Sequence, residues 1–163
     1  MAMAFGLAAQ PAPAADDPLL AQMAGNWVGR GTFKSSPSAE PEMVYCKITN
    51  TLSNSGTALN QKGRCAVATN SGRIAGTIQS QGSGAYSGSL ESLSTKGPLK
   101  FSGKATNNQI ALNATFVDRK TNKAGKATIQ TVVSDGKYRT VSKTTDTKTK
   151  AEFVASDITF TKQ

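Results

Sequence analysis

The sequence contains no histidine and only two cysteines, which removes most of the side chains from which enzymes and metal sites are built. A cysteine nucleophile activated by a neighbouring histidine is excluded. Zinc, copper and haem sites draw mainly on histidine or on clustered cysteine. We therefore expect no metal ion and no cofactor.

Acidic residues are also scarce. Ten Asp and Glu stand against nineteen Lys and Arg, so the formal net charge is +9 and the pI is about 9.8. Such an excess attracts polyanions. The basic residues are nevertheless scattered along the chain, and no strand carries the ring pattern of an RNA-binding sheet. We expect most of them to be solvated outward positions on strands, and we expect no specific binding of nucleic acid.

Long apolar runs are missing, so no segment is expected to cross a membrane as a helix. The first seventeen residues, MAMAFGLAAQPAPAADD, resemble the end of a secretory signal that lacks its basic front. Ala12-Pro13-Ala14 fits the small-x-small cleavage rule. We expect residues 1–15 to be a signal-peptide remnant, the alternative being a disordered Ala/Pro tail, and residues 16–163 to form one domain of a periplasmic or secreted protein.

What the chain does have is Ser, Thr, Gly and Asn in plenty, a composition typical of short strands joined by polar turns. One short helix comes first, because Asp17 can cap it, Pro18 fits its first turn and Gly25 ends it. Alternation of apolar and polar residues then predicts about ten strands, at 26–34, 43–52, 58–69, 73–80, 85–93, 99–105, 109–117, 126–134, 137–145 and 150–161.

The two cysteines lie in the first predicted hairpin. If Leu52 pairs with Leu59 across the turn, the same register places Cys46 directly opposite Cys65. We therefore expect a Cys46–Cys65 disulfide, which implies an oxidising compartment; the alternative is two free buried thiols.

Other hairpins can be registered in the same way. Asp135-Gly136 is a favoured two-residue turn. In each hairpin the register sets apolar residues against apolar or small ones. The expected pairs are Val133 with Tyr138, Thr131 with Thr140, Leu99 with Phe116, Phe101 with Ala114, Ile74 with Leu90 and Ile78 with Tyr86.

Ten meandering strands with one apolar face bury that face by closing into a barrel, which also removes the sheet edges. The predicted fold is all-β: an antiparallel up-and-down β-barrel of about ten strands with a short N-terminal helix. Glycine and alanine on the inner wall leave either unfilled volume for a small ligand or mark bends at which the barrel flattens. Both alternatives are open at this point.

Carboxylates offer little for catalysis. Glycosidase-like chemistry needs two facing carboxylates, and only Glu91 and Asp157 have positions from which they could point into a barrel. A charge at a strand end is the commoner explanation of both. The sequence therefore predicts that the protein is not an enzyme.

One motif resembles a known group of proteins. Gly25-Asn26-Trp27 stands where the short helix meets the first strand, and it resembles the Gly-x-Trp signature of the calycins, which include lipocalins and fatty-acid-binding proteins. The resemblance implies a barrel in which Trp27 plugs the closed end against a basic side chain of a late strand. Arg139 and Lys143 are the candidates for that basic partner.

The leading hypothesis is a non-enzymatic exported binding protein that holds a small, largely apolar ligand in a lipocalin-like barrel. Its expected wall contacts are Trp27, Tyr86, Phe101, Phe116 and Tyr138. The alternative is an envelope interaction module whose basic surface binds anionic lipid, glycan or a protein partner.

Overall fold

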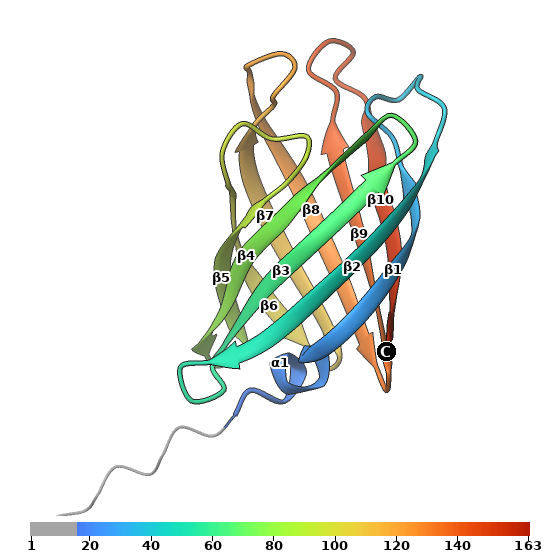
Figure 1. The fold of residues 1–163 in the computed structure, drawn as a ribbon. Coiled ribbons are helices and arrows are strands. Elements are labelled where there is room, and N and C mark those ends of the chain that lie inside the picture. The colour runs from blue at the N-terminus through green and yellow to red at the C-terminus, as the bar shows by residue number, and fades with distance from the viewer. Residues whose placement is uncertain (1–15) are drawn as a thin grey trace, which may run out of the picture.

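The computed structural model describes residues 16–163, so the expected signal remnant lies outside the described residues. One short helix is followed by ten antiparallel strands that close into a barrel, as Figure 1 shows. The elements are α1 (Pro18–Met23), β1 (Gly25–Phe33), β2 (Glu42–Ser53), β3 (Ala58–Val67), β4 (Asn70–Gly82), β5 (Ala85–Glu91), β6 (Leu99–Thr106), β7 (Gln109–Val117), β8 (Ala124–Ser134), β9 (Lys137–Thr145) and β10 (Glu152–Lys162).

Every strand pairs with its neighbours in the sequence, and β10 returns to pair with β1, with Trp27 opposite Lys162. The predicted all-β, up-and-down barrel with an N-terminal helix is thus confirmed. No helix in residues 16–163 has the length and apolar character needed to cross a membrane.

The two ends of the barrel differ. Short connections at residues 54–57, 83–84, 107–108 and 135–136 lie at the end that α1 covers, which we call the capped end. The connections at residues 34–41, 68–69, 92–98, 118–123 and 146–151 lie at the opposite end, which we call the loop end and which is uppermost in Figure 1.

The cysteine hairpin has the predicted register. Leu52 pairs with Leu59 and Cys46 with Cys65, and the two cysteines are joined by a disulfide across β2 and β3. Cys46 is completely buried, so the bridge lies on the inner face of the wall. Because side chains alternate along a strand, this fixes which residues of β2 and β3 face the lumen.

Most other predicted registers are confirmed, including Val133 with Tyr138 and Phe101 with Ala114. The pairing of β4 with β5 was predicted wrongly. Gly76, not Ile74, lies opposite Leu90. The reason is local: a bulge between Ser80 and Gly82 immediately precedes the two-residue turn Ser83-Gly84, in which both residues have positive φ.

That error moved β4 along β5 by two residues, from Ile78 opposite Tyr86 to Ile78 opposite Gly88. A shift of two residues keeps every side chain on its original face of the sheet. The predicted inward face of both strands was therefore unaffected.

Several wall glycines are covered by aromatic rings of the next strand. A Cβ added at Gly29 would lie 2.5 Å from the Phe160 ring, and one at Gly125 would lie 2.6 Å from the Phe116 ring. At Gly31 the obstacle is the backbone carbonyl of Asp157, so close strand approach requires glycine there. The space beside these glycines is thus filled rather than empty.

The disulfide gives the first prediction. Its loop spans a sequence separation of 19 residues, for which the chain-entropy treatment predicts about 3 kcal/mol of stabilisation. We expect the free energy of unfolding in urea to fall by about that amount when a reductant is present throughout the titration. The double variant Cys46→Ala/Cys65→Ala is the control, because its stability should not respond to reductant. Equal unfolding midpoints of the wild type with and without reductant would contradict the prediction.

Candidate ligand-binding lumen

Helix α1 closes the capped end of the barrel. Asp17 accepts hydrogen bonds at Oδ1 from the backbone N–H groups of Leu19 and Leu20, at 3.0 and 3.1 Å, and so caps the first turn. Leu20 is completely buried, and Leu19 and Met23 are 7 % exposed. The apolar side of this short helix therefore closes the lumen at the capped end.

The start of the helix is also tied to the barrel wall. The Tyr86 hydroxyl on β5 donates to Oδ2 of Asp17 at 2.8 Å, and the Asp17 backbone N–H donates to the Gly56 carbonyl. Burial, together with the neighbouring Asp17 carboxylate, raises the pKa of Tyr86 well above its usual range. One carboxylate thus caps the helix and anchors it to β5 at the same time.

The end of the helix is held from two further strands. The Met23 carbonyl accepts hydrogen bonds from Trp27 Nε1 at 2.8 Å and from Asn50 Nδ2 at 2.9 Å. Asn50 is 2 % exposed, its Nδ2 also donates to the Tyr138 hydroxyl, and its Oδ1 accepts from Gln61 Nε2. This buried polar network is fully paired, as a network in a low-dielectric core must be.

An aromatic stack supports helix α1 at the capped end. Tyr138 meets Trp27 edge-on, with ring centroids 4.8 Å apart, and stacks on Phe160 at 4.6 Å. The cation against Trp27 is Lys162 of β10, whose Nζ lies 5.5 Å from the ring centroid. The expected partners Arg139 and Lys143 were wrong. Their side chains point away from the lumen and pair with Asp157 and Glu152.

Burial of the lumen-facing side chains changes along the barrel axis. Near the capped end the largest of them are closed off from solvent, with Trp27, Ile110 and Val133 at no more than 2 % exposure. Towards the loop end, six apolar residues on the same inward faces are only partly buried, although Val44 on β2 is 6 % exposed there. The six are Phe33, Leu90, Leu99, Phe101, Phe116 and Phe153. Because outward residues alternate with them, these side chains lie on the inner face of the wall.

One side of the lumen is polar. Thr131 and Thr140 face each other across β8 and β9 with their hydroxyls 3.0 Å apart, and Ser142 and Ser156 do so across β9 and β10 at 2.6 Å. These hydroxyls share the inward face with Tyr138 and Ile158. The lumen therefore offers hydroxyl groups along β8–β10, and it is mainly apolar elsewhere apart from Asn50 and Gln61.

The five predicted wall residues fall into two groups. Trp27, Tyr86 and Tyr138 are buried at the capped end and belong to the floor beneath the lumen. Phe101 and Phe116 lie further along the barrel, are partly buried, and cover Gly88 and Gly125. As ligand contacts, all five remain predictions.

Sequence reasoning missed the polar residues of the floor. Asn50 has the inward parity of Cys46 and Ile48, yet a polar residue on an apolar face gives no signal of what it will bond. Asp17 was recognised only as a helix cap, and its bond to Tyr86 spans 69 residues. Lys162 could have been found, because the β1–β10 closure places it opposite Trp27.

The two carboxylates considered for catalysis do not face the lumen. Glu91 and Asp157 alternate with the inward residues Leu90 and Ile158, so they point outward. Asp157 forms a bidentate pair with Arg139, at 2.8 and 2.6 Å, and this hydrogen bonding lowers the pKa of Asp157. The expectation that either could point into the barrel was wrong. Within residues 16–163, no three His, Cys, Asp or Glu side chains gather as a metal site.

Two open hollows are lined mainly by outward side chains of the wall. One lies over β6–β9, where Lys100, Lys126 and Lys143 flank Asn113. Another lies over β2–β5, where Asn60 and the other outward side chains are mainly uncharged and polar.

A search with models of protein families finds no match to the chain, and a search of curated proteins finds none either.

The closure of the capped end by α1 can be tested by removing the carboxylate of Asp17, which caps the helix and binds Tyr86. We expect Asp17→Ala to lower the free energy of unfolding by about 2 kcal/mol, since it removes a helix cap and leaves the Tyr86 hydroxyl without its partner. Tyr86→Phe is the matched variant. It keeps the cap and should cost only about 1 kcal/mol. Urea titration measures both, and equal losses would contradict the double role of Asp17.

Alkaline titration tests the burial of the floor. The pKa values of Tyr86 and Tyr138 are raised in the folded state, for both mainly by burial. The unfolded chain then releases these protons first, so stability falls as pH rises above about 10. In Tyr45→Phe, which retains only these two tyrosines, tyrosinate absorbance should rise together with the loss of far-ultraviolet circular dichroism. Ionisation of these two tyrosines while the circular dichroism signal stays unchanged would contradict the prediction.

Proposed function

We propose that this protein is a non-enzymatic binding protein that holds a small, largely apolar molecule in the half of its lumen next to the loop end. The observation that carries the proposal is the change in burial along the axis. Apolar inward residues such as Phe116 are accessible at one end, whereas the other end is closed by α1. A site closed at one end and open at the other matches how concave ligand sites are built.

The width of the barrel supports this proposal. Eight strands already enclose enough space for side chains or one small ligand, and barrel diameter grows roughly with strand number. Ten strands enclose more. The rings of Phe101 and Phe116 lie against Gly88 and Gly125, so these glycines let both rings lie close to the wall.

The chemistry of the wall favours a ligand with a polar group on an apolar body. Phe101 and Phe116 of β6 and β7 supply apolar contact area, and the hydroxyls of Thr140, Ser142 and Ser156 lie further round the wall on β9 and β10. Hydroxyls orient a ligand through hydrogen bonds without a charge. Trp27 and Tyr138 form the rigid floor against which the ligand rests.

The proposed location is the periplasm or the outside of the cell. The Cys46–Cys65 disulfide supports it, since such bridges persist in oxidising compartments. A protein that carries an apolar molecule through water needs a lumen that excludes water from the ligand, and the polar outer wall keeps the loaded barrel in solution.

The proposal can be tested by placing a large side chain inside the lumen. Ala127 lies on the inward face of β8, opposite Thr144, and is partly buried. We expect Ala127→Phe to reduce binding of the neutral probe N-phenyl-1-naphthylamine at least tenfold, measured by probe fluorescence. Native mass spectrometry of the wild type purified without detergent should show an added mass that Ala127→Phe lacks.

The control places the same ring on the outside. Ala111 of β7 is exposed, and Ala111→Phe should bind the probe like the wild type. Thermal unfolding of both variants verifies that each is folded. Unchanged probe affinity in a folded Ala127→Phe, or an absence of probe binding by the wild type, would rule the proposal out.

A further inference from the structure

The arginines of this chain differ in whether they form contacts within the fold. Lysine outnumbers arginine on the surface, and the five arginines are Arg30, Arg64, Arg73, Arg119 and Arg139. Two of them form contacts within the fold. Arg139 forms the bidentate pair with Asp157, and Arg119 donates from Nε to the Thr95 carbonyl. The other three lie on the outer face of β1–β4. Arginine presents a planar fork of donors that matches phosphate and carboxylate oxygens.

Strand register brings cations directly opposite one another on that face. Lys47 of β2 pairs with Arg64 of β3, and Arg64 pairs with Arg73 of β4. Lys62 occupies the outward position of β3 that precedes Arg64. Like charges directly opposite each other destabilise a sheet, so the row costs stability that ordinary surface charge would not.

Nothing in the described part of the chain neutralises most of this row. Arg73 lies 3.6 Å from Glu91, and both side chains are largely exposed. No carboxylate of residues 16–163 forms an ion pair with Lys47, Lys62 or Arg64. An outside anion is therefore what would relieve the repulsion.

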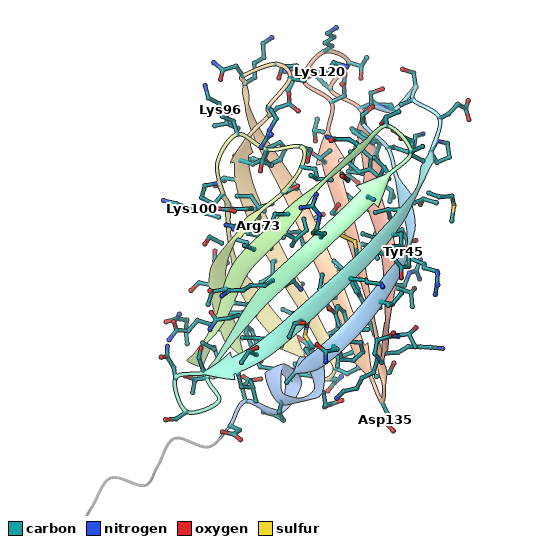
Figure 2. The ribbon with its side chains drawn as sticks, in the orientation of Figure 1. Tyr45, Arg73, Lys96, Lys100, Lys120 and Asp135 are labelled. Carbon is teal, nitrogen blue, oxygen red and sulfur yellow. A yellow bond between two sulfur atoms is a disulfide. The ribbon has the colours of Figure 1, made fainter. Side chains whose placement is uncertain are left out.

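Exposed apolar side chains adjoin the row. Met43 and Tyr45 occupy the outward positions of β2 that precede Lys47, with 70 % and 39 % of their surface exposed. The guanidinium of Arg30 lies 5.3 Å from the centroid of the Tyr45 ring. Figure 2 shows Tyr45 and Arg73 on the same side of the barrel, away from the loop-end residues Lys96 and Lys120.

We propose that the outer face of β1–β4 docks on the surface of an anionic phospholipid bilayer. We call it the docking face; it consists of Arg30, Met43, Tyr45, Lys47, Lys62, Arg64 and Arg73. Its cations approach the lipid phosphates, while Met43 and Tyr45 enter the boundary between headgroups and acyl chains. This function is independent of the proposed lumen ligand.

A bilayer fits better than a soluble polyanion because it uses both kinds of side chain. An acidic polymer accounts for Lys47, Arg64 and Arg73 but gives Met43 no apolar surroundings. The row of Lys100 and Lys126 on the opposite wall has cations with no exposed large apolar residue among the side chains that line its hollow. That wall therefore provides the matched comparison.

The experiment measures cosedimentation with vesicles of equal parts phosphatidylcholine and phosphatidylglycerol. The wild type should bind at about 0.1 M salt and be released at about 1 M, because salt screens exposed charges. Arg64→Ser/Arg73→Ser should weaken binding about 25-fold, at about fivefold for each cation removed. Met43→Ser should weaken it without changing the charge.

The control Lys100→Ser/Lys126→Ser removes the same charge from the opposite wall and should reduce binding far less. Equal losses in the two double variants would mean that net charge alone attracts the protein, which would overturn the proposal. Failure of the wild type to bind these vesicles, or binding to soluble polyglutamate with equal affinity, would also overturn it. Urea titration should show that Arg64→Ser/Arg73→Ser is at least as stable as the wild type, since it removes like-charge opposition.

Discussion

Closure of the sheet is the constraint on which the rest of this structure depends. Once β10 pairs with β1, each residue of a strand faces either the lumen or solvent, and a register error of one residue would exchange the two sets. The disulfide enforces the choice early in the chain, because Cys46 and Cys65 can be joined only in one pairing of β2 with β3. The inner and outer faces can therefore be considered separately.

A closed barrel still has two open ends. At the capped end the opening is covered by α1, a helix too short to be stable alone. Its six residues are held by bonds from outside it: Tyr86 to Asp17 at the start, and Trp27 and Asn50 to the Met23 carbonyl at the end. The Gly-x-Trp motif thus has a physical meaning here. Gly25 has φ of 121°, which lets the chain turn from helix to strand and brings Trp27 under the helix.

Most of the architecture was predictable because the determinants of its strands and hairpins are local in sequence. Alternation marks the strands, turn residues such as Asp135-Gly136 set the registers, and cysteine placement agrees with the hydrophobic pattern. The floor of the lumen was not predictable in the same way. Asn50 and Tyr138 meet across 88 residues, and no pattern in the sequence tells which buried amide will find which hydroxyl. The β4–β5 register was predicted wrongly for a different reason, since a bulge beside Gly82 leaves no mark in the alternation of apolar and polar residues.

The two proposed functions use opposite faces of the same strands, and this makes them separable. On β2, Lys47 lies on the docking face while its neighbours Cys46 and Ile48 face the lumen. The docking face is on the outer flank of β1–β4, whereas the mouth of the lumen lies at the loop end, among the connections at residues 34–41, 68–69, 92–98, 118–123 and 146–151. The docking contact and the ligand contact would thus use different side chains of the same strands. Substitutions on one face should then leave the other function intact, because successive residues of a strand point their side chains to opposite faces of the wall.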